Sequence, residues 1–529
     1  MNKVIIDGSN LSIDEVYAIA HERREIRLAD HAVSNILDSR QFLELLIANG
    51  IPIYGVTTGY GEMVSILIDK KYETELQHNL IRSHAAGIAP FFSKEESRAI
   101  LLARINSLAK GYSAITKSFI DRLIFYLNHD IIPVIPEIGS LGASGDLAPL
   151  AHLALTLIGE GSIFGADGQP MPTRDKLTEL GIKPLDFKFK EGLATINGTS
   201  AMTGLAALLI YDAFIQIKTA EIIAALVLEN QKALNSPFSP QGNNIARPHQ
   251  GQIDTAFNIT NLIDGSRLIT NHETLCSNLL EQKNGAVTLT NVYLQKAYTL
   301  RCIPQIVGAI RDTLYHAQKI VTIELNSAND NPLFFKDNQV FHGGNFHGQP
   351  IAFAMDFLAI ALTQLGVLSE RRTNRLLNKQ LNSGLTPFLV KNQPGLHCGL
   401  AGTQYPATAL VAENRLTSTP ASIQSIPSNA DNQDVVSMGL IAARNARKIL
   451  NNNTYILAIE LISAAQAIDV AGQIELLSTP GKTIHRLVRS SVSCLEADRY
   501  MSEDINKIAS LIKTGQLIEA LASIHIKLR

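Results

Sequence analysis

The tripeptide Ala143-Ser144-Gly145 has the most distinctive chemical potential in this sequence. If the amide nitrogen of Gly145 attacks the carbonyl carbon of Ala143, a five-membered ring closes, and loss of water leaves Ser144 as an exocyclic methylidene. The product is an electrophile that needs no added cofactor. The attacking residue must be glycine, because only a residue without a side chain lets the nitrogen and the carbonyl approach in backbone geometry that other residues avoid.

The residues after the tripeptide predict a helix. Asp146 has the side chain preferred at an N-cap, Pro149 suits the first turn, and apolar residues recur at helical spacing until Gly159. The N-terminus of a helix carries about half a positive charge, which makes an electrophile beside it more electrophilic. A phosphate- or nucleotide-binding loop is the alternative, but the segment lacks the lysine and the glycine spacing of such loops.

Five blocks of sequence carry a resemblance to one enzyme family. The segment from Ile138 to His152 resembles the signature of ammonia-lyases and aminomutases that use 4-methylideneimidazole-5-one, which is the ring described above. The resemblance covers almost the whole chain and implies that this prosthetic group forms autocatalytically from Ala143-Ser144-Gly145. The four further blocks that match the family are Tyr54–Gly61, Ile196–Ser200, Tyr298–Gln305 and Gly343–Gly348.

The resemblance implies catalytic and binding roles for single residues. Elimination of ammonia needs a base for a weakly acidic β-proton and an electrophile that captures the amine. The family places the base at Tyr54, and it places the cation that binds the substrate carboxylate at Arg301, with Tyr298 one helical turn away. Asn197 matches the asparagine that hydrogen-bonds the ring, and Phe346 matches an aromatic side chain packed beside it. Taken alone, each of these residues has an ordinary structural interpretation.

Three further positions bear on the substrate side chain. A Ser-His pair such as Ser83-His84 occurs in histidine ammonia-lyases and in several tyrosine-acting members of the family, where the histidine binds the phenol. Histidine lyases carry a glutamate where this chain has Gln433, which disfavours histidine as the substrate. The block around Tyr405 resembles the tyrosine-acting members and adds a second partner for a phenol. Such a site rejects phenylalanine because its polar groups would be left unpaired, although His84 and Tyr405 also have an interpretation as core residues.

The loop after the predicted base distinguishes two outcomes of the same elimination. Its residues Tyr60, Glu62 and Met63 resemble the lid of bacterial tyrosine 2,3-aminomutases, which return ammonia to the β-carbon. Plain lyases more often have a Gly-Phe-Gly-Pro pattern there. We therefore expect a tyrosine 2,3-aminomutase, with tyrosine ammonia-lyase as the alternative, followed by histidine or phenylalanine ammonia-lyase. The duration of lid closure decides between them.

Composition is typical of a soluble globular protein. The 529 residues are 46% hydrophobic and 18% charged, with a net charge of −2 and no basic tract, so no nucleic acid partner is expected. Charges at Asp212, Lys218 and Glu221 interrupt the most apolar stretch, so no membrane span is expected either. The N-terminus lacks a signal-peptide pattern, and we expect a cytoplasmic enzyme. The sequence contains no complete metal motif, so we expect no metal.

The pattern of elements changes near residue 200. Residues 1–200 combine short elements with the tyrosine loop and the ring-forming loop, and residues 201–529 are expected to form a long-helix bundle and a C-terminal helical region. The fold class is therefore mainly α, with a central bundle like that of aspartases and fumarases. The family resemblance also implies a homotetramer with shared active sites. The predicted long helices are 202–234, 303–326, 349–378, 435–470 and 503–526.

Overall fold

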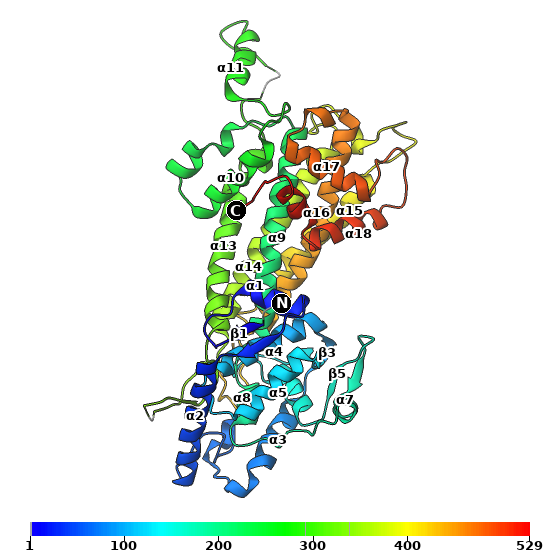
Figure 1. Cartoon of the computed structure of the whole chain (residues 1–529). Coiled ribbons are helices and arrows are strands. Elements are labelled where there is room, and N and C mark those ends of the chain that lie inside the picture. The colour runs from blue at the N-terminus through cyan, green and yellow to red at the C-terminus, as the bar shows by residue number, and fades with distance from the viewer. Residues whose placement is uncertain (1–2, 291–292, 338) are drawn as a thin grey trace. The chain divides into compact units, whose positions relative to one another are not determined.

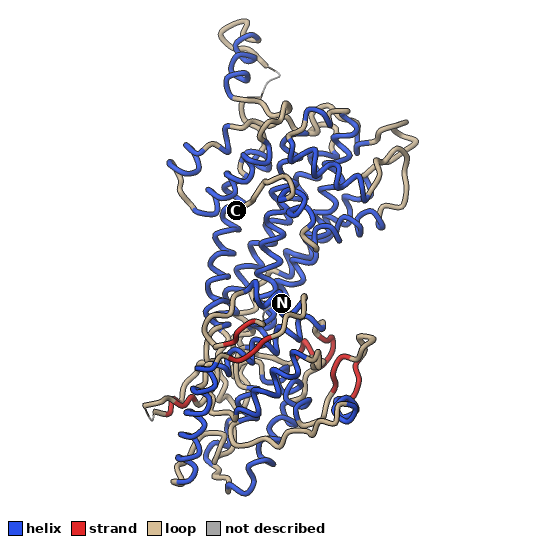
Figure 2. Tube along the Cα trace, in the orientation of Figure 1, coloured by secondary structure: helices blue, strands red, loops and turns tan. Residues whose placement is uncertain are grey.

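The computed structural model describes residues 3–290, 293–337 and 339–529, and its regular structure is almost entirely helical (Figures 1 and 2). The predicted mainly α fold class is confirmed. The chain forms two compact units. Unit 1 consists of Met1–Tyr211, Ala317–Asp356 and Pro420–Asn445, and unit 2 consists of Asp212–His316, Phe357–Thr419 and Ala446–Arg529. The sequence-based division at residue 200 stays a prediction.

Unit 1 combines short helices with four two-stranded sheets among its described residues. β1 pairs with β2 in parallel, whereas the pairs β3–β4, β5–β6 and β7–β8 are antiparallel. Two-stranded sheets of this size connect loops to one another, and the hydrophobic core is formed by the helices. The elements of unit 1 are β1 (Val4–Ile6), α1 (Ile13–His21), β2 (Ile26–Leu28), α2 (Asp30–Ala48), η1 (Gly61–Ser65), η2 (Lys70–Tyr72), α3 (Glu73–His84), β3 (Ile88–Phe91), α4 (Lys94–Ala109), α5 (Lys117–Asn128), β4 (Pro136–Ile138), α6 (Leu147–Leu157), β5 (Ser162–Phe164), β6 (Pro170–Pro172), α7 (Thr173–Glu179), α8 (Glu191–Ile196), β7 (Leu333–Phe334) and β8 (Val340–Phe341).

Two linkers in unit 1 position the ring-forming tripeptide. The first joins β4 to α6 and contains residues 139–146, and the second joins α8 to α9 and contains residues 197–199. An isolated parallel bridge between Gly145 and Gly198 ties the linkers together. Helix α6 packs against both α3 and α8, which holds the helices that flank the linkers in one cluster.

Unit 2 contains most of the long-helix bundle. Four long helices contain the boundaries between the units, and they are α9 (Ser200–Asn230), α13 (Ile303–Leu325), α14 (Gln349–Leu377) and α16 (Gly439–Ala471). The other elements of unit 2 are η3 (Ser236–Phe238), η4 (Gln241–Ile245), α10 (Gln250–Ile263), α11 (His272–Glu281), α12 (Tyr298–Arg301), η5 (Pro387–Leu389), η6 (Ala401–Thr403), α15 (Gln404–Thr417), η7 (Ile474–Leu476), α17 (Thr479–Ser491), α18 (Ser502–Lys513) and α19 (Gln516–Ala522).

Buried ion pairs join the long helices within unit 2. Arg311 of α13 pairs with Glu221 of α9 at 2.7 Å, and both side chains are fully buried. Arg372 of α14 pairs with Glu460 of α16 at 2.5 Å, also in the interior. A buried charge without its partner is strongly destabilising. These pairs therefore favour one alignment of the helices over others that would separate the charges.

Three of the long helices are apolar enough to resemble membrane spans. By length and composition alone, α9, α14 and α16 qualify, and 78%, 72% and 78% of their most apolar windows are buried inside the protein. A helix that is apolar on most sides is expected at the centre of a bundle. The apolar side chains of these helices are thus mostly buried against other parts of the protein.

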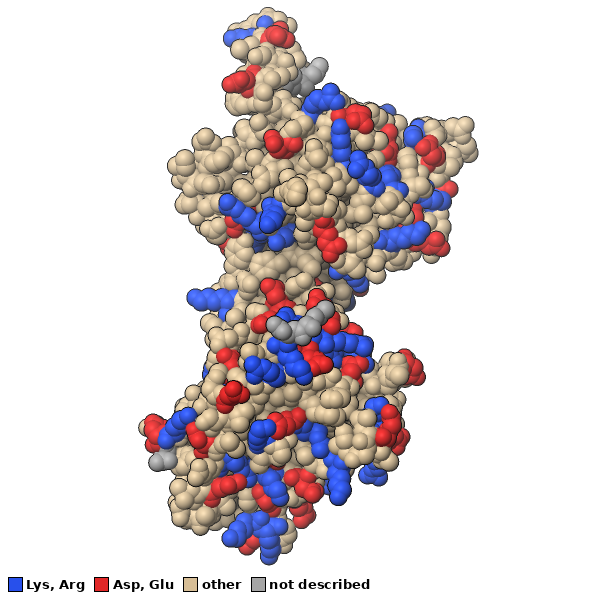
Figure 3. Space-filling view, in the orientation of Figure 1, with Lys and Arg blue, Asp and Glu red and all other residues tan. Residues whose placement is uncertain are grey.

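Charged side chains are interspersed on the surface. On the face drawn in Figure 3, basic and acidic residues alternate over short distances. Several form ion pairs, such as Arg82 with Glu160 at 2.6 Å and Lys117 with Asp121 at 2.5 Å. Exposed pairs of this kind contribute little to stability, but their mixture agrees with the net charge of −2.

Four of the five predicted long helices are present as single helices, with ends shifted by up to a few residues. The prediction of one helix over 503–526 is wrong. Gly515 adopts a left-handed φ of +73°, which ends α18 and allows α19 to start in a new direction. Helix α16 begins at Gly439, four residues after the predicted start, because residues 433–438 form a loop that packs on the ring-forming segment.

Candidate active site

The tripeptide lies in a compact turn that only glycine permits at its end. Gly145 has a left-handed φ of +73°, and a Cβ built on it would overlap the carbonyl group of Gly198. The amide of the next residue, Asp146, donates to that same carbonyl at 2.7 Å. The segment is therefore held against residue 198 in a conformation closed to residues with side chains.

Two predicted site residues contact Ser144. Asn197 donates from Nδ2 to the Ser144 carbonyl at 3.1 Å, and Gln433 donates from Nε2 to the Ser144 hydroxyl at 2.8 Å. The hydroxyl of Ser428 donates to Oε1 of Gln433 at 3.0 Å. Because its oxygen is occupied in this way, the Gln433 amide presents its nitrogen to Ser144.

Asp146 precedes α6 as predicted, but its side chain does not cap that helix. The buried carboxylate instead accepts from the Ser140 hydroxyl and from the Met202 amide, each at 2.8 Å. It thereby caps the first turn of α9 and links the two helices that follow the linkers. Burial raises the pKa of Asp146 to about 6, while these hydrogen bonds partly oppose the rise.

Tyr54 lies under the predicted lid. Its phenolic oxygen accepts a hydrogen bond from the Gly61 amide at 3.1 Å, and its ring meets that of Tyr60 edge-on, with centroids 6.4 Å apart. The Tyr60 hydroxyl accepts from Nε2 of Gln77 at 3.0 Å. Burial raises the pKa of Tyr60, so this phenol stays neutral. Glu62 and Met63 follow in η1 with exposed side chains.

His84 ends helix α3 with its ring half-buried. Its Nδ1 lies 2.8 Å from the Leu80 carbonyl and 3.0 Å from the Ser83 hydroxyl. A carbonyl only accepts, so Nδ1 carries the hydrogen and Nε2 of a neutral ring carries the lone pair. This tautomer makes His84 an acceptor for a hydroxyl group.

Phe346 lies half-buried in a loop attached to the ring-forming segment. The amide of Gly348 donates to the Gly142 carbonyl at 3.1 Å, and Nε2 of His347 lies 3.1 Å from the Val435 carbonyl. The loop that carries Phe346 is thus fastened to the tripeptide loop and to the loop that carries Gln433. All three loops belong to unit 1.

The other predicted residues lie in unit 2. Arg301 stacks on the ring of Tyr298, with its guanidinium 4.8 Å from the centroid, and Tyr298 is 68% exposed. Tyr405, near the start of α15, is 74% exposed. Tyr298, Arg301 and Tyr405 thus all belong to unit 2.

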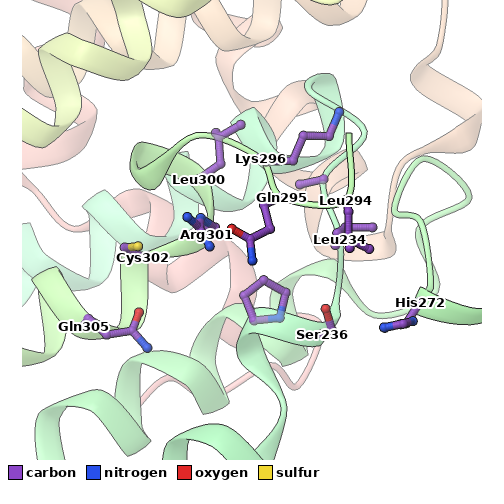
Figure 4. A pocket seen from close by; sticks show the side chains of 12 residues that line it. Leu234, Ser236, His272, Leu294, Gln295, Lys296, Leu300, Arg301, Cys302 and Gln305 are labelled. Atoms are coloured by element: carbon purple, nitrogen blue, oxygen red, sulfur yellow. The ribbon is translucent and has the colours of Figure 1, made fainter. Parts of the chain in front are cut away.

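Arg301 lines a pocket of about 440 Å³ within unit 2 (Figure 4). Its Nε and the Oε1 of Gln305 are buried without a hydrogen-bond partner among the residues the structure describes. Burial lowers the pKa of Lys296, another lining residue, and the nearby Arg375 and Lys232 lower it further. A concave, cationic pocket in which the Arg301 Nε–H donor lacks a partner among the described residues suits a carboxylate.

A model of the aromatic amino acid lyase family matches residues 11–490. The chain belongs to this family. This lyase-family chain is 55% identical over 521 residues to an MIO-dependent tyrosine 2,3-aminomutase of Streptomyces globisporus, with 98% of this chain and 96% of the relative covered. It is 53% identical over 524 residues to a tyrosine ammonia-lyase of Cupriavidus metallidurans, with 99% and 98% covered. The crystal structure of tyrosine aminomutase from Streptomyces globisporus matches it with a TM-score of 0.97 and 54% identity over 100% of both chains.

The family resemblance read from the five blocks is thereby confirmed. The structure of this lyase-family member also contains supporting residues that sequence reasoning missed. Ser428 orients Gln433, and Gln77 holds Tyr60. Arg104 donates to the carbonyl of Asn197 at 3.0 Å. A serine, a glutamine or an arginine inside a helix or loop carries no local signal of such a role, because the partner lies far along the chain.

Proposed function

We propose that this protein is a tyrosine 2,3-aminomutase that depends on a 4-methylideneimidazole-5-one ring formed from Ala143-Ser144-Gly145. The observation that carries the proposal is the pinched Ser144-Gly145 turn, held by Asn197 and Gln433. The relative named as a tyrosine 2,3-aminomutase, at 55% identity over nearly the whole chain, supports the assignment of the reaction.

The residues around the tripeptide fit such a ring. Asn197 Oδ1 is buried and has no partner among the described residues, so an acceptor remains for a donor that the ring or the substrate supplies. Asn197 would hold the group through the Ser144 carbonyl, which the ring retains, and the N-terminus of α6 lies two residues beyond Gly145. When present, the ring supplies an electrophile that captures the substrate and makes ammonia a better leaving group.

Tyr54 serves as the base for the β-proton of the substrate. The N–H of Gly61 donates to its phenolic oxygen at 3.1 Å, which fixes the position of that oxygen. Tyr60 packs edge-on against the same ring and excludes water from that side. The lid loop therefore both positions the base and shields it.

Tyrosine is the substrate that the polar groups fit best. Nε2 of His84 accepts a hydrogen bond from a phenol, and Tyr405 offers a second hydroxyl in the assembled site. The Arg301 pocket takes the carboxylate, for which a planar guanidinium is suited. The neutral amide of Gln433 replaces the glutamate of histidine lyases, so a cationic imidazole finds less stabilisation here.

Retention of the arylacrylate intermediate separates the mutase from the lyase. The lid is fastened by the Gln77–Tyr60 hydrogen bond and by the Gly59 amide, which donates to the Ile66 carbonyl at 2.9 Å. A lid restrained in this way favours re-addition of ammonia at the β-carbon over release. Tyrosine ammonia-lyase is the second candidate, since a relative of that name is 53% identical.

The enzyme works as a homotetramer in which subunits share active sites. This assembly would bring the Arg301 pocket of one chain to the tripeptide of another. An apolar groove of about 740 Å³ between α13 and α14 of unit 2 supports the assembly, because Phe357 and Ile360 on its edge are 46% and 49% exposed. Apolar patches of this kind mark protein interfaces.

Product analysis tests the proposed function. The purified protein is incubated separately with L-tyrosine, L-phenylalanine and L-histidine, and the products are resolved by chromatography, with Ser144→Ala as the control. Of the three amino acids, we expect only L-tyrosine to be converted, with β-tyrosine as the main product. Only p-coumarate would support the lyase instead, and no turnover of any of the three amino acids by protein that carries the ring would overturn both assignments.

A further inference from the structure

A buried arginine lies behind the ring-forming turn. Arg104 of α4 is fully buried, and its Nη1 donates to the carbonyl of Asn197 at 3.0 Å and to Oδ1 of Asn329 at 3.3 Å. Burial lowers the pKa of its guanidinium to about 10, which leaves it charged at neutral pH. Arg104 is one of the largest fully buried side chains among the described residues.

The hydrogen bonding of Arg104 differs from that of the other buried arginines. Arg98, Arg311 and Arg372 each pair directly with a carboxylate. The hydrogen-bond partners of Arg104 in the described chain are neutral oxygens, and its Nε and Nη2 have none. A buried cation without a direct counter-ion costs stability. Such a group is a candidate for a role at the site it faces.

The peptide that Arg104 holds contacts the turn on both sides of Gly145. Asn197 donates from its side chain to the Ser144 carbonyl, and the Gly198 carbonyl accepts from the Asp146 amide. A Cβ built on Gly198 would overlap the Arg104 guanidinium and the Asn329 side chain. The close approach of the arginine to this peptide therefore depends on glycine at position 198.

A buried network of hydrogen bonds and one ion pair supports this contact. Asn329 accepts from the Ser107 hydroxyl at 3.0 Å and donates to the Thr199 hydroxyl at 2.7 Å, and Thr199 in turn donates to Glu324. The next residue, Asp330, pairs with the buried Lys190 at 2.5 Å. The charges of Asp330 and Asp146 partly offset the effect of burial on the pKa of Arg104. The peptide 197–198 is thus fixed from the side opposite the tripeptide.

We propose that Arg104 is a positioning residue for formation of the prosthetic ring, an inference that rests on the proposed function. In this reaction the nitrogen of Gly145 bonds to the carbonyl carbon of Ala143. The carbonyl oxygen of Ala143 leaves as water with the amide hydrogens of Ser144 and Gly145, which leaves a C=N bond. The Ser144 hydroxyl then leaves with the Cα hydrogen as a second water. No oxidant or reductant is needed. Arg104 holds residues 197–198 so that both flanks of Gly145 stay in place during closure.

Intact mass measures ring formation without any assay of turnover, because a chain with the ring is two water molecules lighter. We would purify wild type, Arg104→Lys and Arg104→Met, and compare them with Arg98→Lys and Arg98→Met. Arg98 is a matched control, since it lies in the same helix, is 3% exposed and bonds the Ile19 and Leu127 carbonyls far from the tripeptide. Mass and near-ultraviolet absorbance are read only on the folded fraction from gel filtration.

We expect the wild type and both Arg98 variants to carry the ring in nearly every folded chain. At the same time after synthesis, the ring should be present in about tenfold fewer folded chains of the Arg104 variants, the loss typical of one charge-assisted hydrogen bond. Complete ring formation in folded Arg104 variants would overturn the proposal. The same holds if neither Arg104 variant folds while the Arg98 variants do, because Arg104 would then be structural. A wild-type chain without the mass loss would instead refute the proposed function.

Discussion

Gln433 donates a hydrogen bond from Nε2 to the hydroxyl of Ser144 at 2.8 Å, across 289 residues of sequence. The Ser428 hydroxyl fixes the orientation of this amide. The group at position 433 therefore acts directly on the residue that would become the electrophile. This contact connects the loop that carries Gln433 to the ring-forming turn.

Replacing Gln433 by glutamate removes the donor to Ser144 and adds a negative charge. We expect Gln433→Glu to lower kcat/KM for tyrosine by about tenfold, because the added negative charge beside residue 144 makes the electrophile less reactive toward the substrate amine. Steady-state kinetics with tyrosine and histidine measure the change. Gln424→Glu, an exposed position on the same loop, is the control, and equal effects of both variants would contradict the role of Gln433.

Replacing Ser144 by alanine removes the hydroxyl that must leave as water. Ser144→Ala should abolish turnover, and the chain should keep the mass expected from its sequence, while it still unfolds cooperatively on heating, because a ring-bearing wild type also lacks this hydroxyl. Mass spectrometry and calorimetry test this. Measurable turnover by the variant would rule out a ring made at this position.

Replacing Tyr54 by phenylalanine separates ring formation from proton abstraction. Tyr54→Phe should retain the ring by intact mass but lose about 10²–10⁴ in kcat, as expected when a general base is removed. The lost hydrogen bond from Gly61 should affect lid position only locally. A variant with less than a threefold change in kcat would exclude Tyr54 as the base, where threefold is about 0.7 kcal/mol.

The lid loop should influence the ratio of the two products, p-coumarate and β-tyrosine. Tyr60→Phe removes the hydrogen bond from Gln77 and should loosen the loop, since one such bond contributes about 0.5–1.5 kcal/mol. We expect the ratio of p-coumarate to β-tyrosine to rise several-fold, measured by chromatography under single-turnover conditions. Tyr72→Phe, at a 47% exposed position, is the control. An unchanged ratio would show that this bond does not restrain the lid.

Burial raises the pKa of Asp146 to about 6, so the free energy of unfolding should depend on pH. In the unfolded chain an aspartate titrates near 4, at about 3.9. Between these two pH values the Asp146 carboxyl is protonated in the folded state and ionised in the unfolded state. Its contribution to the free energy of unfolding therefore falls as the pH rises from about 4 to about 6, and it does not change further above pH 6. Asp146→Asn should remove that fall, which is on the order of 3 kcal/mol. Urea unfolding of both proteins from pH 4.5 to 7 measures it, and parallel curves would contradict it.

Much of the candidate site was predictable because its chemistry lies in short blocks. The β-hydroxyl and the flexible glycine of Ser144-Gly145 are properties of adjacent residues, and the apolar periodicity of α9, α13, α14 and α16 is local as well. Side chains at fixed spacing specify a helix or a turn whatever surrounds them. Local prediction failed at residues 503–526, where an apolar repeat continued through Gly515 and concealed a helix break.

Contacts between distant segments were not predictable from the pattern of residues. The amide of Gln433 on Ser144, the tilt of Tyr60 against Tyr54, and the guanidinium of Arg104 behind Asn197 all depend on how linkers pack. Asp146 shows the same limit, since its carboxylate caps α9 and not the helix it precedes. Residue types and order therefore establish which electrophile and which fold class this chain can form. Packing establishes which side chains contact Ser144, because hydrogen bonds depend on positions in space that spacing along the chain does not encode.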